Sequence, residues 1–382
     1  MKAKQSRALR VCHISTAHQA VDTRVFWREA VGLASLGYDV TLFARDRFTG
    51  DRNGVHLVGL PTYDRRLTRM TVGTIRALRA ASSVGADIYH VHDPELLPGL
   101  AVFRLLGRRT VYDAHELLSS QVLSKPYLPA RARVIAGFVA RGLERLAALA
   151  SDEIITVSPA CAIPFPETKT TIVANYPGRD ELSISDSDVG GWDEPLRVIY
   201  LGGIARSRGI LELIEAISLI NRTHAIRLTL IGPFENESML AEARSHRGWR
   251  YVDYLGVLPH VEVGSHLVGA VAGVVNFLPS PNNSVSWPNK LFEYMAAGIP
   301  VVASNFPAWR EIVEGVGCGV CIDPTVPASI ASGVIELVDN EATSKKMGSA
   351  GRAAMLQQFN WEEQLEHLDS AYQRLMKRRP LK

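Results

Sequence analysis

The stretch that decides most about this chain is Pro288-Asn-Lys-Leu-Phe-Glu-Tyr-Met-Ala-Ala-Gly-Ile-Pro-Val-Val-Ala-Ser304. It predicts a loop, one short helix, a glycine stop and a buried strand. Pro288 suits the first position of a helix, because its missing N–H is not needed there, and Gly298 with Pro300 ends the helix. The apolar residues from 301 to 303 are then typical of a buried strand in a parallel sheet.

The start of this helix also predicts a binding site for an anion. The first amides of the helix have no partner within it, and the helix dipole adds partial positive charge at the same place. Lys290 contributes a full positive charge, and Glu293 lies about one turn further along. A phosphate at the helix start and a diol held by a carboxylate describe a ribonucleotide diphosphate. We therefore expect Asn289, Lys290 and Leu291 to bind the diphosphate and Glu293 to bind the ribose.

A second stretch, Leu201-Gly-Gly-Ile-Ala-Arg-Ser-Arg-Gly-Ile210, follows one predicted strand and precedes a predicted helix. Gly202 and Gly203 would let the backbone approach a phosphate closely. Arg206 and Arg208 would add charge-assisted hydrogen bonds to a diphosphate. The spacing is not G-x-G-x-x-G, so the dinucleotide-binding fingerprint is absent. A tight turn with two surface arginines is the alternative interpretation.

Histidines and carboxylates follow two other predicted strands, and these are the candidate catalytic residues. His92 and Asp93 end one strand, and His115 comes just after the next. Because the carboxyl ends of parallel strands meet at one edge of a sheet, His115, Asp93 and His92 are expected to lie close together and to face the reacting groups of a ligand. For Asp93 the alternative is a helix N-cap followed by proline at the first helical position.

A loop after the first strand supplies candidates for the acceptor side of the site. His18 and Arg24 would lie over the edge of the sheet, and Asp22 precedes a helix that it would cap. Glu95, at the turn after Asp93, joins this group. The cap alone is the alternative explanation for Asp22.

A metal is not expected. His90 and His92 would share one face of their strand, at a spacing of two residues. A zinc site would need further ligands, and the sequence places none clearly. Cys318 and Cys321 have metal-like spacing, but no second pair accompanies them, so buried thiols are the better interpretation. We likewise expect no cofactor.

Size and composition are those of an ordinary soluble protein with two domains. The chain has 382 residues, of which 47% are hydrophobic and 21% charged. It shows neither an apolar run of membrane-spanning length nor a signal-peptide core, so a cytoplasmic location is expected. Residues 1–150 hold 22 basic and 12 acidic residues, against 20 and 27 in the remainder. A basic first half favours an anionic surface or substrate on that side, although solvated helix faces explain much of it.

One helix in the basic half leaves two interpretations open. The segment 130–150 carries Arg131, Arg133, Arg141 and Arg145 among apolar residues. Such a helix either rests on anionic lipid at the inner membrane surface or is an ordinary helix that faces the core.

Strands and helices alternate along both halves of the chain, which predicts two parallel sheets covered by helices. We expect one Rossmann-like domain at 1–177, a polar linker at 178–194, a second Rossmann-like domain at 195–360 and a last helix at 361–382. Two such sheets facing a central cleft could hold a donor on one side and an acceptor on the other.

Taken together, these motifs resemble the retaining glycosyltransferase family 4, which has the GT-B fold, over nearly the whole chain. The motifs that carry the resemblance are Asp22-Thr-Arg24, Gly37-Tyr-Asp-Val40, His92-Asp-Pro-Glu95, Asp113-Ala-His-Glu116, Leu201-Gly-Gly203 with Arg208-Gly209, Pro288 to Gly298, and Phe359-Asn-Trp361. The resemblance implies a nucleotide-sugar site in the C-terminal domain and an acceptor site in the N-terminal domain. It also implies a metal-independent reaction and a last helix that crosses back to the first domain.

Two positions depart from the family pattern. The family has two glutamates separated by seven residues; Glu293 matches the second, but Val285 stands at the first. The neighbouring loop residues Asn282, Asn283 and Ser284 would then bind the donor sugar instead. Arg206 would replace an arginine that the family often has at the position of Gly203.

The sequence therefore predicts a retaining glycosyltransferase that moves a sugar from a nucleotide-diphosphate donor, with UDP as the family-level expectation for the nucleotide. Its acceptor would be a glycan or a lipid diphosphate in surface polysaccharide or glycoconjugate synthesis, and no nucleic acid is expected as a partner. Two alternatives stay open: a catalytically weak partner subunit that binds nucleotide sugars, which Val285 suggests, and a GT-B sugar-nucleotide epimerase or phosphorylase.

Overall fold

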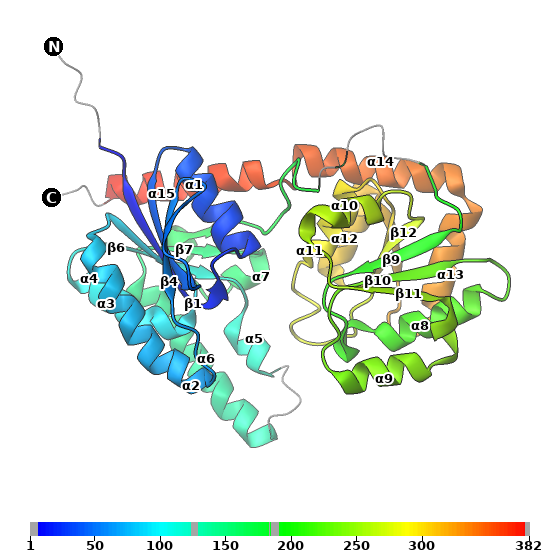
Figure 1. Ribbon diagram of the computed structural model, residues 1–382, viewed down its shortest axis with the longest axis horizontal. Coiled ribbons are helices and arrows are strands. Elements are labelled where there is room, and N and C mark those ends of the chain that lie inside the picture. Colours follow the sequence, from blue (N-terminus) through cyan, green and yellow to red (C-terminus); the bar gives the residue numbers. More distant parts are fainter. Residues whose placement is uncertain (1–6, 124–128, 183, 185–190, 379–382) are drawn as a thin grey trace, which may run out of the picture. The chain divides into compact units, whose positions relative to one another are not determined.

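The chain forms two compact units in the computed structural model (Figure 1). The structure describes residues 7–123, 129–182, 184 and 191–378. Unit 1 comprises residues 1–175 and 363–382, and unit 2 comprises residues 176–362. Much of the predicted linker, 183 and 185–190, lies outside the described residues.

Unit 1 is built on one eight-stranded sheet in the order β3-β4-β2-β1-β5-β6-β7-β8, in which all pairs are parallel except β3 with β4. Its strands are β1 (Arg10–Gln19), β2 (Asp39–Arg45), β3 (Gly50–Arg52), β4 (Val55–Leu60), β5 (Ile88–Val91), β6 (Arg109–Ala114), β7 (Glu153–Thr156) and β8 (Thr170–Ile172). Its helices are η1 (Thr23–Ala30), α1 (Val31–Ser35), α2 (Arg66–Thr68), η2 (Arg69–Gly73), α3 (Thr74–Val84), η3 (Pro94–Leu96), α4 (Leu97–Leu105), α5 (Leu118–Leu123), α6 (Ala130–Ala150), α7 (Pro159–Ala162), η4 (Glu167–Lys169) and most of α15 (Trp361–Arg378).

Unit 2 repeats this architecture with a six-stranded, all-parallel sheet in the order β11-β10-β9-β12-β13-β14. Its strands are β9 (Arg197–Leu201), β10 (Arg227–Ile231), β11 (Val252–Gly256), β12 (Ala272–Val275), β13 (Val301–Ser304) and β14 (Gly319–Ile322). Its helices are η6 (Arg206–Arg208), α8 (Ile210–Ile220), α9 (Glu237–Ser245), η7 (Arg247–Tyr251), α10 (His260–Leu267), α11 (Asn289–Ala296), α12 (Pro307–Val316), α13 (Pro327–Asp339) and α14 (Glu341–Gln357).

The central strands are buried along their whole length because helices cover both faces of each sheet. Every residue of β5, β6, β12 and β13 is buried, as expected for apolar strands in a parallel sheet. In unit 1 the core includes Ile14, Tyr89 and Leu100. In unit 2 it includes Leu213 and Leu230. The predicted α/β fold class is thereby confirmed.

Each sheet reverses its strand order at one point, and that point fixes where a ligand is expected. In unit 1 the reversal lies between β1 and β5, and in unit 2 it lies between β9 and β12. Ligands of open α/β sheets bind just beyond the carboxyl ends of the strands at such a point. The residues that follow these four strands are therefore the first place to look for function.

The last helix, α15, belongs to unit 1 from residue 363 on. Gln364 accepts a hydrogen bond from the Ala174 amide at 2.8 Å, and Arg374 pairs with Glu153 at 3.0 Å. Deeper in the unit, the Tyr372 hydroxyl lies 2.7 Å from Nδ1 of His90 on β5. The helix is thus connected to the sheet by buried polar contacts as well as by packing.

Several elements were not predicted, among them the edge strand β3 and the helices α5, α7 and α12. One predicted helix has a different form: the amphipathic pattern of residues 23–36 predicts a single α-helix, but the segment begins with the π-helical η1. In a π-helix residues five apart stack along the axis, which brings Arg24 and Glu29 together, with Nε and Oε1 2.9 Å apart.

No helix in the described part of the chain has both the length and the hydropathy needed to cross a bilayer.

Candidate active site

Asp93 connects the ends of β1 and β5 at the reversal point of unit 1. Its Oδ2 accepts hydrogen bonds from the amides of Thr16 and Ala17, at 2.6 and 3.1 Å, and from the Ser15 hydroxyl at 3.0 Å. The side chain is 4% exposed. Asp93 therefore holds the last part of β1, which extends further than the sequence predicted, and it makes no side-chain cap to η3.

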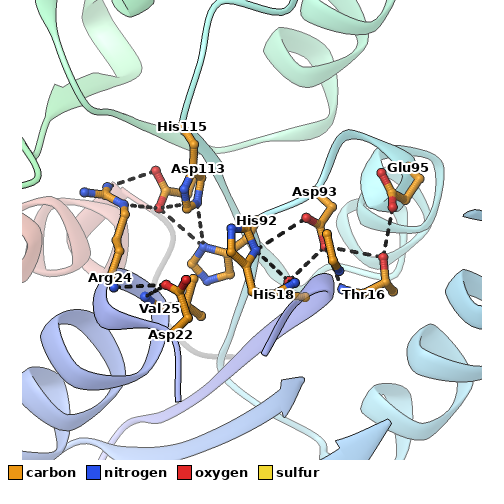
Figure 2. A network of polar contacts seen from close by, with 12 residues as sticks. Thr16, His18, Asp22, Arg24, Val25, His92, Asp93, Glu95, Asp113 and His115 are labelled. Carbon is orange, nitrogen blue, oxygen red and sulfur yellow. Dashed lines mark hydrogen bonds and ion pairs between the residues drawn. The ribbon is translucent and has the colours of Figure 1, made fainter. Parts of the chain in front are cut away.

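Next to Asp93, a buried ion pair joins η1 to the end of β6 (Figure 2). The Arg24 guanidinium donates Nε and Nη2 to the two carboxylate oxygens of Asp113, each at 3.0 Å. Asp22 caps η1, because its Oδ1 accepts from the amides of Arg24 and Val25 at 2.9 Å. Asp22 thus caps the helix that carries Arg24, and Asp113 holds the Arg24 guanidinium. The sequence analysis did not single out Asp113 as a partner.

Two of the site's histidines contact Asp113, and the nitrogens that do so, His92 Nδ1 and His115 Nε2, lie 3.3 Å from each other. Oδ2 of Asp113 lies 3.3 Å from Nδ1 of His92 and 3.2 Å from Nε2 of His115. The His92 side chain is fully buried, whereas His115 is 21% and His18 27% exposed. His115 and His18 stack with ring centroids 5.0 Å apart. A ligand could therefore contact the imidazoles of His115 and His18. The buried His92 ring lies behind them, next to His115.

Glu95 contributes a further buried contact at the same edge. Its Oε1 pairs with the Arg69 guanidinium and accepts from the Thr16 hydroxyl at 3.0 Å. The predicted set His18, Asp93, Glu95 and His115 is therefore brought together around the end of β1 (Figure 2).

Burial and pairing shift the ionisation of this group in opposite directions. Burial raises the pKa of Asp113, but Arg24 and the neighbouring imidazoles outweigh it, so that this pKa lies well below its usual value. Burial, with the nearby Asp113 charge, raises the pKa of Glu29 well above its usual value, despite Arg24. The pKa of His92 is lowered by burial, although Asp113 offsets part of that effect.

In unit 2, the glycine turn after β9 packs closely against a neighbouring strand end, where Gly232 has no room for a side chain. Gly202 has φ +100°, and Gly232, at the end of β10, has φ +137°. A Cβ on Gly232 would lie 2.2 Å from the carbonyl oxygen of Gly202. Gly209 is held by Asn276, whose Nδ2 donates to its carbonyl oxygen at 2.9 Å.

The cations predicted to bind diphosphate are gathered beside this turn, with one exception. The Lys290 ammonium lies 3.6 Å from the ring centre of Tyr200, and the Arg208 guanidinium lies 3.7 Å from that of Phe277. A Cβ on Gly202 would be 3.6 Å from Lys290 Nζ, so the ammonium lies directly beside the turn. Arg206 instead pairs with Glu242 at 2.7 Å on the surface.

Lys290 has an unusual environment for a lysine. Burial, and then the charge of Arg208, lower the pKa of its ammonium well below the usual value, and Glu293 offsets part of this. It lies in the first turn of α11, where Pro288 provides no side-chain cap. A buried lysine at the uncapped start of a helix, with Arg208 nearby, is typical of an anion-binding site.

The loop before α11 is attached to the same turn. Asn283 is buried, and its Nδ2 donates to the carbonyl oxygens of Leu278 and Ser207, at 2.9 and 3.4 Å. The Ser284 hydroxyl donates to the Ser280 carbonyl at 2.9 Å, and Asn282 is half-buried. Around α11, Asn289 is exposed, Glu293 is half-buried and Leu291 is buried in the core.

Several residues of these sites were missed by the sequence analysis. Asp113 was noticed only as part of a motif, and Asn276, Tyr200 and Phe277 were not considered as partners of the glycine turn. Phe277 and Asn276 come directly after β12, the strand at the reversal point. Their position directly after that strand could have identified them as candidate site residues, because ligands are expected at the strand ends where the strand order reverses.

Comparison with solved structures defines the class of protein. The chain superposes on a sucrose-phosphate synthase from Thermosynechococcus elongatus with a TM-score of 0.73 at 19% identity, covering 97% of this chain and 100% of the other. Anabaena HepE in complex with UDP gives 0.68 at 14%, with 96% and 99% covered. An α,α-trehalose-phosphate synthase from Burkholderia vietnamiensis gives 0.71 at 12%, with 98% and 100% covered. The fold is GT-B.

Sequence comparison then gives the family. Residues 185–354 match the family described as glycosyl transferases group 1, and residues 23–163 match glycosyltransferase family 4. Both halves of the chain thus match families of glycosyltransferases.

Curated relatives match over part of their length. Glycogen synthase from Mycobacterium tuberculosis is 29% identical over 170 residues, which cover 44% of this chain and 40% of that protein. The capsular polysaccharide biosynthesis glycosyltransferase CapM from Staphylococcus aureus is 24% identical over 183 residues, covering 47% and 46%. The O-antigen chain mannosyltransferase B from Escherichia coli is 26% identical over 183 residues, covering 46% and 45%. The chain thus spans about half the length of the curated relatives it matches.

Proposed function

We propose that the protein is a retaining glycosyltransferase that transfers a sugar from a nucleotide-diphosphate donor, with UDP as the nucleotide, and needs no metal ion in the transfer step. The observation that carries this proposal is the pair of cations beside the glycine turn of unit 2. Lys290 and Arg208 lie over the aromatic rings of Tyr200 and Phe277, next to Gly202 and the uncapped start of α11.

The diphosphate would take the place between the turn and the helix. Two cations and the first amides of α11 would then face the leaving group, where negative charge grows as the glycosidic bond breaks. These positive groups would stabilise the leaving diphosphate, which is the role that a metal ion has in other transferases. Glu293, one turn along α11, would hold the ribose hydroxyls, and the loop with Asn282, Asn283 and Ser284 would contact the donor sugar.

The acceptor would bind in unit 1, at the end of β1 and the loop that follows it. His115 and His18 have exposed imidazoles there, so they would touch the reacting sugar or the acceptor. Asp93, His92 and Arg24 are buried and would act by holding that loop and orienting His115. No covalent nucleophile is proposed; the departing diphosphate would instead guide the acceptor to the same face of the sugar.

The relatives support a role in surface polysaccharide or glycoconjugate synthesis, because the names of CapM and of the O-antigen mannosyltransferase include capsular polysaccharide and O-antigen chains. HepE was solved with UDP and with UDP-glucose, which supports a uridine nucleotide. We infer a cytoplasmic enzyme whose acceptor is a glycan or a lipid diphosphate at the inner membrane surface.

Contact with the membrane would involve α6. Four apolar side chains on this helix are between 55% and 67% exposed, namely Val134, Ile135, Phe138 and Val139. Arg131, Arg141 and Arg145 are exposed on the same helix. An exposed apolar stripe flanked by arginines suits a surface of anionic lipid, whereas a helix facing only the core would bury these residues.

The direct test is nucleotide release from a panel of UDP-, GDP- and TDP-sugars. We expect slow hydrolysis of one UDP-sugar in the absence of acceptor, with retained anomeric configuration in any transfer product. Glu293→Ala should reduce turnover by about 100-fold, because buried ribose hydroxyls would lose a charged partner. The matched control is Glu336→Ala on the exposed face of α13, which should turn over like the wild type.

Two other outcomes would each decide against the proposal. Binding of a nucleotide sugar without release or transfer would identify an inert binding subunit, the alternative that Val285 favours. Conversion of the donor into an epimeric nucleotide sugar would identify an epimerase. Wild-type turnover in Glu293→Ala would show that Glu293 does not bind the ribose.

A further inference from the structure

A second set of polar side chains lies entirely inside unit 1, beneath the ends of β1 and β5. His13 lies on β1, Glu29 on η1, His90 on β5 and His92 directly after β5, and all four are 0 to 3% exposed. His13 and His90 are direct neighbours across the β1–β5 pair. The sequence offered only His90 and His92 as possible ligands, and the fold brings two more to the same place.

The distances among three of these side chains are those of a coordination sphere. His13 Nδ1 lies 2.9 Å from His92 Nε2 and 3.9 Å from Glu29 Oε2, and His92 Nε2 lies 4.0 Å from Glu29 Oε2. A point equidistant from these three atoms lies about 2.1 Å from each, which is a typical zinc–nitrogen or zinc–oxygen distance. His90 offers a fourth ligand atom, and all four atoms lie within 4.8 Å of one another.

The opposite ring nitrogens of His92 and His90 are held as they are in zinc sites, whereas His13 Nε2 is buried with no hydrogen-bond partner among the described residues. His92 Nδ1 lies 3.3 Å from Asp113 Oδ2, and His90 Nδ1 lies 2.7 Å from the Tyr372 hydroxyl. Such outer contacts fix the ring orientation and leave the other nitrogen with its lone pair toward the metal. Among the described residues, His90 Nε2 and Glu29 Oε2 are buried with no hydrogen-bond partner.

The charges in this part of the core do not balance without a further positive group. Glu29 and Asp113 are two fully buried carboxylates, and Arg24 is the cation that contacts both. A buried carboxylate without a compensating partner is costly, so either a proton or a cation must be present. Three imidazoles and a carboxylate form a ligand set suited to zinc.

We propose that His13, Glu29, His90 and His92 bind a structural zinc ion. Four protein ligands, all buried, leave no position for substrate, so the ion would stabilise the fold and take no part in sugar transfer. It would connect η1 and β5 to β1, close to the end of β1 that carries His18. Because Asp113 contacts both His92 and His115, the ion would also help to fix the position of the His115 ring.

The first test is the metal content of the full chain, purified without a metal-affinity step and measured by inductively coupled plasma mass spectrometry. We expect close to one zinc per chain, and a lower melting temperature after chelation that added zinc restores. An anomalous difference map at the zinc edge should give a peak among His13, Glu29 and His92.

The zinc content of single variants tests whether these residues are the ligands. Glu29→Gln and His13→Gln should each lose most of the zinc, while His56→Gln should keep it, because His56 is a half-exposed surface histidine paired with Asp51. The wild-type measurement stands even if a variant fails to fold.

Three results would overturn the proposal. One is wild-type protein without zinc whose melting temperature responds neither to zinc nor to a chelator, which would assign the balancing charge to a proton shared by Glu29 and Asp113. The second is an anomalous peak at His92, Asp113 and His115, the other group with metal-like spacing. The third is unchanged zinc content in Glu29→Gln. None of these results concerns nucleotide release, so the proposed function is tested separately.

Discussion

Lys290 is the residue on which the account of the donor site depends most. It is a buried cation whose ammonium lies against an aromatic ring and beside the glycine turn. Burial and Arg208 hold its pKa well below the usual lysine value. Such a lysine loses its proton more easily in the free protein and regains it when an anion binds.

Binding of UDP should therefore depend on pH. A bound diphosphate favours the charged ammonium, so the pKa of Lys290 rises on binding. Affinity should be highest below the depressed pKa of the free protein and should fall as the pH rises through it, by up to about tenfold per pH unit. Isothermal titration calorimetry in buffers of different ionisation enthalpy should detect uptake of up to one proton.

Lys290→Met is the matched control for this pH dependence. It should bind UDP more weakly and with no proton uptake above pH ~7.5, where the phosphates are already ionised. Equal proton uptake in wild type and variant would assign the effect to another group and remove the role given to Lys290.

At this scale the sequence identified ligand-like residues better than it identified their partners. Lys290 and Arg208 were found because a charge at a helix start or beside a glycine turn can be recognised from adjacent residues. Their aromatic neighbours are Tyr200 on β9 and Phe277 just after β12, so only the folded sheet brings them together. The surface position of Arg206 likewise depends on Glu242, which is 36 residues away.

At the scale of elements, helix signals and strand patterns predicted most boundaries well. The helices α6 and α8, and the strands β9 and β10, have the predicted limits because caps, prolines and apolar runs mark them locally. The π-helical η1 was not predicted, since the buried pairing of Arg24 with Asp113 and Glu29 is a tertiary contact. The strand β3 has three residues at a sheet edge, which is too short for a periodic pattern.

The apolar stripe of α6 gives a prediction that belongs to this scale. Phe138→Glu should weaken cosedimentation with vesicles that contain phosphatidylglycerol by about tenfold, because it replaces an inserting ring with a charge that anionic lipid repels. Leu36→Glu is the control, since Leu36 is also half-exposed but lies at the end of α1. Equal vesicle binding by both variants and the wild type would show that α6 does not contact lipid.

At the scale of the whole molecule, the two units have the same architecture. Each has a parallel sheet that reverses its strand order once, and each gathers its polar candidates just beyond that reversal. The alternation of strands and helices was enough to predict two such sheets. It could not predict the buried cluster of His13, Glu29, His90 and His92, because those residues come from three elements whose contact depends on strand order and on the winding of η1.

The central claim is that unit 2 binds a diphosphate between the turn 202–209 and the start of α11. A crystal structure with UDP tests it most directly. The account predicts that the phosphate oxygens lie within hydrogen-bond distance of Lys290 Nζ and the Arg208 guanidinium, with Glu293 on the ribose. Phosphates bound anywhere else on the protein, with Lys290 still against Tyr200 and unpaired with them, would contradict it.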